Sequence, residues 1–305
     1  MTRTVIVGAA GQDGRLLSRR LEERGDTLLR IGRRAADGVE TLDLLDATAV
    51  QKAVEVFGPN EIYYLPAFHQ SSEDRERLTP TDLWQKSFDT HVAGAIHFLE
   101  AIRSSMPAAR LFYAGSCLVF GPFAPSPQDE QTPFSPATIY GITKAAGVEC
   151  CRFYRREHGL FAATGLLYNH ESQFRPSSFL SQKVATAARE IKAGRRSELV
   201  LGDLSAETDW GYAPDYADAM TRILQAGQAD DWIVATGKPH TVQDFVEAAF
   251  AAVGLDWRPY VREEKAILRS RRGRLVGNPT KLMRETGWAP SVSFKEMVGL
   301  MVTQT

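Results

Sequence analysis

The sequence predicts an α/β fold, a Rossmann-type doubly wound parallel sheet with a smaller C-terminal domain. Two observations lead to this prediction. Apolar, β-branched runs alternate with amphipathic runs of helical spacing through the first half of the chain. A glycine-rich turn lies between the first of these strands and the first helix. Strands and helices that alternate in this way form a parallel sheet covered by helices on both faces.

The expected elements follow in order along the chain. Strands are predicted where short apolar runs end in a turn, at residues 4–7, 28–31, 61–65, 110–114 and 165–168. Helices are predicted where apolar residues recur at helical spacing, at residues 14–24, 46–57, 88–103 and 140–157. Residues 121–127, Gly-Pro-Phe-Ala-Pro-Ser-Pro, form a loop by composition.

Composition argues against several classes of protein. A hydrophobic content of 44% and a net charge of −1 are ordinary for a globular protein and indicate no nucleic-acid partner. Cys117, Cys150 and Cys151 form no C-x-x-C pair, which predicts a reduced, cytoplasmic protein without a disulfide framework. No run approaches the ~18 apolar residues of a membrane span, so no membrane partner is expected. His69 and His170 have no second ligand at a metal spacing, so no metal site is predicted.

Gly8, Gly11 and Gly14 lie three residues apart between the first strand and the first helix. In a dinucleotide site, such glycines let the backbone approach a pyrophosphate, and the helix N-terminus supplies free N–H groups. Glycines that only end a strand are the alternative, but the strand-turn-helix context favours the cofactor. We therefore predict that these glycines bind a dinucleotide, together with Gln12 and Asp13.

The end of the second strand indicates which dinucleotide binds. An NAD site usually places an acidic residue there, whereas this chain has Gly32-Arg33-Arg34, which suits a 2′-phosphate. NADP is therefore favoured over NAD, and a solvated turn is the alternative for Arg33 and Arg34. Asp43 is predicted to lie beside the adenine, although a surface aspartate is equally ordinary. The remaining predicted cofactor contacts are Leu44, Leu65 and Ala67.

The length of 305 residues leaves room for a cofactor domain and a smaller second domain. We expect an NADP-binding Rossmann domain over residues 1–165, to which a later segment near 209–237 returns. The strand-helix alternation is less regular beyond residue 166. We expect residues 166–208 and 238–305 to form a substrate-binding domain.

A tyrosine, a lysine and a serine form the candidate catalytic group. Tyr140-Gly-Ile-Thr-Lys144 places a phenol and an ammonium on one face of a helix, and Ser116 lies just past the strand at 110–114. A phenol, with an ordinary pKa of ~10, is a useful acid or base near neutral pH only if its anion is stabilised. An adjacent ammonium provides that stabilisation. We predict that Tyr140 and Lys144 act beside the cofactor and that Ser116 hydrogen-bonds the substrate oxygen.

With these residues, the chain resembles the extended short-chain dehydrogenase/reductase (NAD-dependent epimerase/dehydratase) superfamily. It is more closely similar to the GDP-mannose 4,6-dehydratase family. The segments that carry this likeness are Tyr168-Asn-His-Glu-Ser172, Leu201-Gly-Asp-Leu followed by Asp209-Trp-Gly-Tyr, Val234-Ala-Thr-Gly, and Gly277-Asn-Pro with Gly287-Trp-Ala-Pro. The resemblance implies bound NADP(H), a nucleotide-diphosphate sugar linked to GDP as substrate, and a homodimer or homotetramer.

The resemblance also implies a set of substrate-binding residues. They are Asn169, Glu171, Arg175, Lys183, Arg269 and Arg271. A solvated loop is the alternative for the arginine run at 269–274. Two segments depart from the family around the substrate: Glu207-Thr208 stands where the family has an arginine, and Pro66, Phe68 and His69 replace an A-A-Q-S type of segment. An arginine from the run at 269–274 would compensate for the first departure.

The most informative departure concerns the elimination step. The family has a glutamate two residues after the catalytic Ser or Thr, and this chain has Leu118 there, in Gly115-Ser-Cys-Leu-Val-Phe-Gly121. Dehydration across C5 and C6 needs a group that takes the C5 proton, and leucine cannot carry one. Cys117 should point the other way if the segment is extended. Glu130 matches a different glutamate of the family.

These departures favour one function without excluding others. The hydride-transfer residues are present and the dehydratase base is missing, which favours an NADPH-dependent reductase of a 4-keto-6-deoxyhexose, similar to GDP-4-keto-6-deoxymannose reductases. The alternatives are a GDP-mannose 4,6-dehydratase with a displaced base, a sugar-nucleotide epimerase, and a non-catalytic NADP-binding protein.

Overall fold

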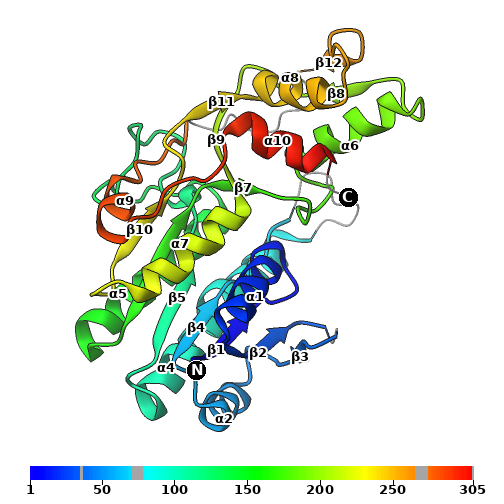
Figure 1. Ribbon diagram of the computed structural model, residues 1–305. Helices are drawn as coiled ribbons and strands as arrows, with labels where there is room; N and C mark the ends of the chain where they lie inside the picture. The colour runs from blue at the N-terminus through cyan, green and yellow to red at the C-terminus, as the bar shows by residue number, and fades with distance from the viewer. Residues whose placement is uncertain (35–36, 71–77, 265–273, 304–305) are drawn as a thin grey trace.

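The computed structural model describes the chain except for residues 35–36, 71–77, 265–273 and 304–305. Its centre is a seven-stranded parallel sheet with the order β10-β6-β5-β4-β1-β2-β3 (Figure 1). The strands are β1 (Arg3–Val7), β2 (Thr27–Gly32), β3 (Glu40–Thr41), β4 (Glu61–Tyr64), β5 (Arg110–Ala114), β6 (Ala162–Leu167) and β10 (Asp231–Val234). This order is doubly wound about β1, which confirms the predicted fold class.

Helices cover both faces of this sheet, because the side chains of each strand alternate between two cores. Val5 and Val7 of β1 belong to the core beneath α2, α4 and α5, whereas Ile6 belongs to the core beneath α1 and α7. Figure 1 shows α1 and α7 side by side on one face. The bounds of the five helices are α1 (Gln12–Arg24), α2 (Ala47–Phe57), α4 (Gly94–Ser105), α5 (Ile139–His158) and α7 (Ala213–Gln225).

One predicted helix of the first half differs from the structure. The sequence predicted a single helix over 88–103, whereas the structure has α3 (Pro80–Phe88), a π-helical turn η1 (Asp89–Ala93) and then α4. The helix therefore begins earlier and is interrupted by a wider turn. Hydrophobic periodicity did not show the interruption, because a π-turn shifts the apolar face by a single residue. The carbonyls of Thr90 and His91 in this turn accept hydrogen bonds from tyrosines of the sheet, as described below.

The second half contains more regular structure than its sequence pattern indicated. Apolar side chains of α6, α8 and α10 form a core of their own with β8 and β9, and these helices lie beyond one end of the large sheet (Figure 1). Smaller sheets with the orders β11-β9-β7 and β12-β8 accompany them. The bounds are α6 (Leu180–Lys192), α8 (Val242–Ala252), α9 (Thr280–Thr286), α10 (Phe294–Thr303), β7 (Asn169–Glu171), β8 (Leu199–Leu201), β9 (Glu207–Tyr212), β11 (Pro239–Thr241) and β12 (Val261–Glu263).

The segment near 209–237 contributes to both parts of the molecule. β10 pairs with β6 at the edge of the large sheet, whereas β9 pairs with β7 and β11 outside it. The domain boundaries stay a prediction. In the described part of the chain, no helix has both the length and the apolar character needed to cross a membrane.

Candidate functional site

The predicted site residues lie on loops and helices that follow adjacent parallel strands. β1, β4 and β5 are neighbours in register, so their carboxyl ends meet at one edge of the sheet. The glycine turn follows β1, residues 65–69 follow β4, and Ser116 follows β5. This edge is where α/β sheets of this type bind ligands.

The glycine turn brings the backbone of α1 close to the end of β1. Gly8 adopts a φ of +86°, and the N–H groups of Gly8 and Ala9 both donate to the carbonyl of Ile31, at 2.8 and 3.0 Å. A Cβ at Gly14 would lie 2.5 Å from the Gly8 carbonyl oxygen, so only glycine permits this packing. Gly11 caps α1 without a side-chain hydrogen bond. The first-turn N–H groups of α1 are thus suited to bind an anionic group such as a pyrophosphate.

Gln12 and Asp13 of this turn also bind the Asn-His-Glu-Ser segment. The Gln12 amide donates to the His170 carbonyl at 3.0 Å and accepts from the Ser172 hydroxyl at 2.9 Å. The Asp13 carboxylate lies 2.9 Å from Nε2 of His170. The glycine turn and β7 are therefore directly connected, across 157 residues of sequence.

The Asp13–His170 contact becomes an ion pair when His170 is protonated. Burial alone would raise the pKa of Asp13, but the charge and hydrogen bond of His170, with the charge of Arg175, outweigh it and lower that pKa. Burial alone would lower the pKa of His170, and the charge and hydrogen bond of Asp13 outweigh it and raise that pKa. The two partners therefore stabilise each other's charged form.

Lys144 is held at the centre of the site. The residue is 1% exposed. Its ammonium donates to the carbonyls of Ala114, at 2.7 Å, and Pro66, at 3.1 Å. Burial lowers the pKa of Lys144 to about 7, although the charges of Asp13 and Cys151 oppose the change. Its Nζ lies 6.0 Å from the ring centroid of Tyr140. Lys144 and Tyr140 therefore lie close together, as predicted.

Tyr140 lies in the first turn of α5, because the Thr138 hydroxyl caps the helix by accepting from the Gly141 N–H at 3.0 Å. Burial, and then the charge of Cys117, raises the pKa of Tyr140 to about 12. The charge of Arg175 and a hydrogen bond with Ser116 act in the opposite direction. A phenol with this pKa is protonated at neutral pH and is a weaker acid than an ordinary tyrosine, so donation of its proton would require stabilisation of the phenolate.

The segment that carries Ser116 is not extended, which corrects the expectation for Cys117. Residues 117–119 form a 3₁₀ turn, η2 (Cys117–Val119). The Leu118 N–H in this turn donates to the Ser116 hydroxyl at 3.2 Å. A tight turn removes the strict alternation on which the expectation depended. Cys117 is buried and acts electrostatically on Tyr140. Glu130 instead accepts from the Ile233 N–H of β10 at 2.9 Å.

Aromatic side chains surround Tyr140. His91 from η1 packs edge-on to its ring at a centroid distance of 5.1 Å, and His69 does so at 5.6 Å. His69 also contacts Phe179 at 5.7 Å. Sequence reasoning missed His91, because it lies inside a predicted helix and no spacing connects it to Tyr140. Among the residues that the structure describes, no group of three or more His, Cys, Asp or Glu is arranged to hold a metal ion.

The predicted substrate residues fall into two groups. Arg175 reaches the site: it lies 3.2 Å from Glu171, 4.0 Å over the ring of Phe179, and affects the pKa of Tyr140. Glu171 is buried and accepts from the Ser181 hydroxyl at 2.6 Å, so its carboxylate is engaged within the protein. Asn169 lies in β7 and Lys183 in α6. Arg269 and Arg271 lie outside the described residues.

The predicted adenosine contacts lie at the other end of the sheet edge. Arg33 and Arg34 follow β2 directly and are exposed. Asp43 and Leu44 follow β3, and the Leu44 carbonyl contacts Nδ1 of His97 at 2.8 Å. The last two predicted contacts, Leu65 and Ala67, follow β4 beside Pro66.

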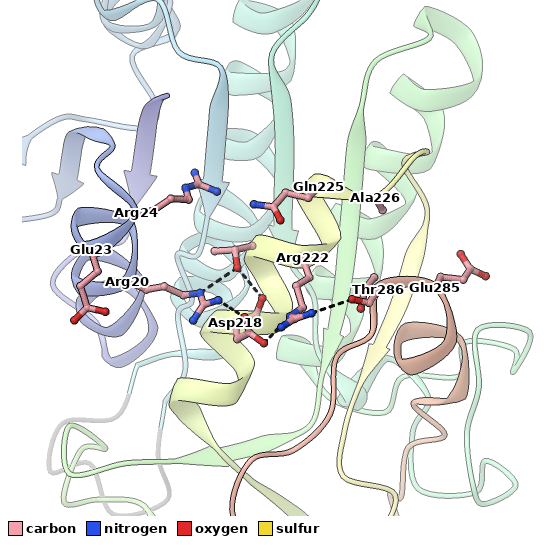
Figure 2. Close-up of a pocket in the computed structure, with 10 residues that line it drawn as sticks. Arg20, Glu23, Arg24, Asp218, Arg222, Gln225, Ala226, Glu285 and Thr286 are labelled. Atoms are coloured by element: carbon pink, nitrogen blue, oxygen red, sulfur yellow. Dashed lines mark hydrogen bonds and ion pairs between the residues drawn. The ribbon is translucent and has the colours of Figure 1, made fainter. Parts of the chain in front are cut away.

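A separate open cavity of about 570 Å³ lies between α1, α7 and α9 (Figure 2). Figure 2 shows Arg20 and Arg222 converging on Asp218. Arg222 also donates to the Thr286 carbonyl at 3.0 Å. No predicted site residue lines this cavity, and each arginine that lines it forms an ion pair with a carboxylate.

Comparison with known proteins supplies the family. The model of the family described as GDP-mannose 4,6 dehydratase matches residues 5–301. The chain belongs to the GDP-mannose 4,6-dehydratase family. GDP-mannose 4,6 dehydratase 2 of Arabidopsis thaliana is 33% identical over 98% of this chain and 86% of its own length. The human GDP-mannose 4,6 dehydratase is 29% identical, over 98% of this chain and 90% of its own length.

Solved structures confirm the fold of this family member. RMD of Pseudomonas aeruginosa, solved with NADPH, has a TM-score of 0.86 at 19% identity and covers 99% of this chain and 98% of its own. The UDP-glucose 4-epimerase of Thermus thermophilus, solved with NAD, has a TM-score of 0.80 at 25% identity and covers 98% and 97%.

Proposed function

We propose that this family member is an NADPH-dependent reductase that acts on a 4-keto-6-deoxyhexose linked to a nucleoside diphosphate, most closely a GDP-4-keto-6-deoxymannose type of substrate. The single observation that carries the proposal is Leu118. Leu118 lies two residues after Ser116, in η2, where the resemblance to the family implies the glutamate of the elimination step, whereas Ser116, Tyr140 and Lys144 are all present in the chain.

The residues of the glycine turn fit a dinucleotide. Gly14 leaves no room for a Cβ, and the uncapped N-terminus of α1 suits a pyrophosphate. Arg33 and Arg34 would hold a 2′-phosphate, and the NADPH bound to RMD supports this choice of cofactor, although the NAD in other structural relatives keeps NAD as the alternative. NADPH would supply a hydride to C4 of the sugar.

The chain itself provides the proton. As the C4 carbonyl becomes an alkoxide, the neutral hydroxyl of Tyr140 donates its proton to that oxygen, and the Ser116 hydroxyl holds the oxygen in place. The ammonium of Lys144 lies beside the ring and stabilises the phenolate that results. The charge of Arg175 acts on the pKa of Tyr140, so we propose that Arg175 binds the diphosphate.

Two parallel reactions test this function. NADPH absorbance is followed after mixing the protein with GDP-4-keto-6-deoxymannose, and keto-sugar formation is followed in a second reaction with GDP-mannose and NADP. Loss of NADPH in the first reaction, with no keto-sugar in the second, supports a reductase. No change in either reaction, together with a higher Tm of the protein in the presence of NADP, supports a non-catalytic binding protein. Interconversion of C4 epimers of a nucleotide sugar supports an epimerase.

A 4,6-dehydratase with a displaced base is the second candidate, and two observations favour it. The family match extends over residues 5–301. Cys117, which lies in a 3₁₀ turn, is close enough to Tyr140 to affect its pKa. Keto-sugar in the second reaction, lost in Cys117→Ala, would establish this function.

Restoring the family glutamate tests the interpretation of Leu118. If the rest of the site still suits a GDP-hexose, Leu118→Glu gains measurable dehydratase activity, because general acid–base catalysis contributes about 10²–10⁴-fold. Leu118→Gln has nearly the same size and cannot transfer the proton, so it is the matched control. Equal activity in both variants would show that residue 118 is not at the position of the base.

A further inference from the structure

His91 connects three parts of the candidate site. The side chain is 0% exposed, although histidine is polar. Its Nε2 lies 2.9 Å from the backbone nitrogen of Phe68, in the loop after β4, and its Nδ1 lies 2.7 Å from the Thr143 hydroxyl of α5. Its ring packs edge-on to Tyr140 at 5.1 Å and 81°.

The hydrogen bonds determine the tautomer of His91. The Phe68 N–H can only donate, so Nε2 must be the acceptor and Nδ1 must carry the hydrogen. Nδ1–H then donates to the Thr143 hydroxyl, which in turn donates to the Ile139 carbonyl at 2.9 Å. Burial, and then the charge of Lys144, lowers the pKa of His91 to about 2. The His91 ring is therefore neutral, and it accepts a hydrogen bond from Phe68 while it donates one to Thr143.

The backbone of His91 is fixed by the sheet. The Tyr113 hydroxyl of β5 donates to the His91 carbonyl at 2.9 Å, and the Tyr64 hydroxyl of β4 donates to the Thr90 carbonyl at 2.7 Å. Two glycines make room for these tyrosines. A Cβ at Gly94 would lie 2.4 Å from the Tyr64 hydroxyl, and one at Gly147 would lie 2.1 Å from the Tyr113 hydroxyl. Two buried phenols thus hydrogen-bond the backbone of the π-helical turn η1.

We infer that His91 is a positioning residue. Held in the π-helical turn η1, it fixes the position of the Tyr140 ring relative to the loop at residues 66–69. Pro66 in this loop binds the ammonium of Lys144, and His69 contacts the Tyr140 ring. Displacement of the loop would therefore disturb both members of the proton-donating pair. His91 acts on the substrate only through Tyr140 and this loop.

The test uses the full-length protein with 3-fluorotyrosine placed at residue 140, whose ¹⁹F resonance reports the surroundings of that ring without any substrate. His91→Phe keeps the aromatic contact and removes both hydrogen bonds. His91→Gln returns a carbonyl oxygen to the Nε2 position, where it accepts from Phe68. We expect the ¹⁹F resonance to shift or broaden in His91→Phe and to return toward wild type in His91→Gln. His158→Phe is the control, because His158 lies about 27 Å along the same helix from Tyr140.

A turnover measurement accompanies this test and rests on the proposed function. His91→Phe should lower kcat about tenfold, because the partly buried Phe68 N–H loses its acceptor, while KM for NADPH changes less than about twofold. His91→Gln should recover most of kcat. If the wild type reduces no keto-sugar, the proposed function fails, and the ¹⁹F result still decides the role of His91.

Two results would overturn the inference. One is an unchanged ¹⁹F resonance in folded His91→Phe, or no recovery in His91→Gln. The other is measured on wild type, which keeps the test valid if the variants do not fold. Nitrogen-15 shifts of His91 should show the neutral Nδ1–H tautomer from pH 5.5 to 8. A ring that carries its hydrogen on Nε2, or that titrates near its ordinary pKa of about 6.5, could not accept from Phe68.

Discussion

The two ends of the candidate site are built differently. Around Tyr140 and Lys144, side chains are buried and tied to backbone carbonyls and to each other. At the end of β2, the side chains of Arg33 and Arg34 are exposed. The end around Tyr140 is therefore held by contacts within the protein, and we expect a bound nucleotide to order the exposed end.

This difference agrees with the functions proposed for the two ends. A proton donor must be held within a fraction of an ångström of its target, and buried hydrogen bonds provide that precision. A 2′-phosphate carries enough charge to order two flexible arginines when it binds. Substitutions at the buried end should therefore change turnover and stability, and those at the exposed end should change cofactor preference alone.

The largest effect is expected at Tyr140. Tyr140→Phe removes the proton donor and should lower kcat at least ~10²-fold, with little change in NADPH affinity. Tyr154→Phe is the matched control on the same helix, since its hydroxyl binds Glu100 at 2.5 Å. Steady-state kinetics and NADPH fluorescence titration measure the two quantities. Normal turnover in Tyr140→Phe would remove this residue from the mechanism.

The next effect concerns cofactor preference. The double variant Arg33→Ser with Arg34→Ser should weaken NADPH binding about tenfold and leave NADH binding nearly unchanged, because only NADPH carries the 2′-phosphate. Arg19→Ser, an exposed arginine of α1 paired with Glu23, is the control. Binding titrations with both nucleotides measure the ratio. An unchanged ratio would make Arg33 and Arg34 a solvated turn and reopen the choice of NAD.

Lys144 is proposed to serve activity, but its burial should reduce the stability of the fold. Its pKa of about 7 lies below the unfolded value, so protonation destabilises the fold fully below pH 7 and progressively less as the pH rises toward 10.5. In cofactor-free protein, Lys144→Met should raise Tm by a few degrees at pH 6.5, and this gain should shrink by pH 9. Thermal unfolding across this range measures the difference. A gain that is constant with pH would show that the ammonium is not buried in solution.

The smallest effect is expected at the ion pair of Asp13 and His170. The raised pKa of His170 adds stability that is fully present below about pH 6.5 and is lost as the pH rises through the folded value. His170→Gln should therefore lower Tm by about 1–3 °C at pH 6 relative to pH 9. His158→Gln, an exposed histidine of α5, should show no such difference. Equal pH profiles of wild type and His170→Gln would contradict the ion pair.

The amino-acid sequence alone predicted the fold class, which the structure confirms, and it singled out Tyr140 and Lys144 as candidate catalytic residues. Strand-helix alternation predicts the parallel sheet, and Tyr140 and Lys144 share a helix face because the α-helical period places residues four apart together. The glycine turn was also predictable, since the close approach at Gly14 leaves a residue-type signature. These features are local, so a local pattern contains them.

Only the tertiary structure decided which distant residues complete the site. The π-helical turn at His91 depends on phenols from β4 and β5 that are distant in sequence. The contact of Asp13 with His170 and the 3₁₀ turn at Cys117 likewise depend on packing. Such contacts leave no period or spacing in the sequence, because their energy comes from burial and hydrogen bonds between segments that only folding brings together.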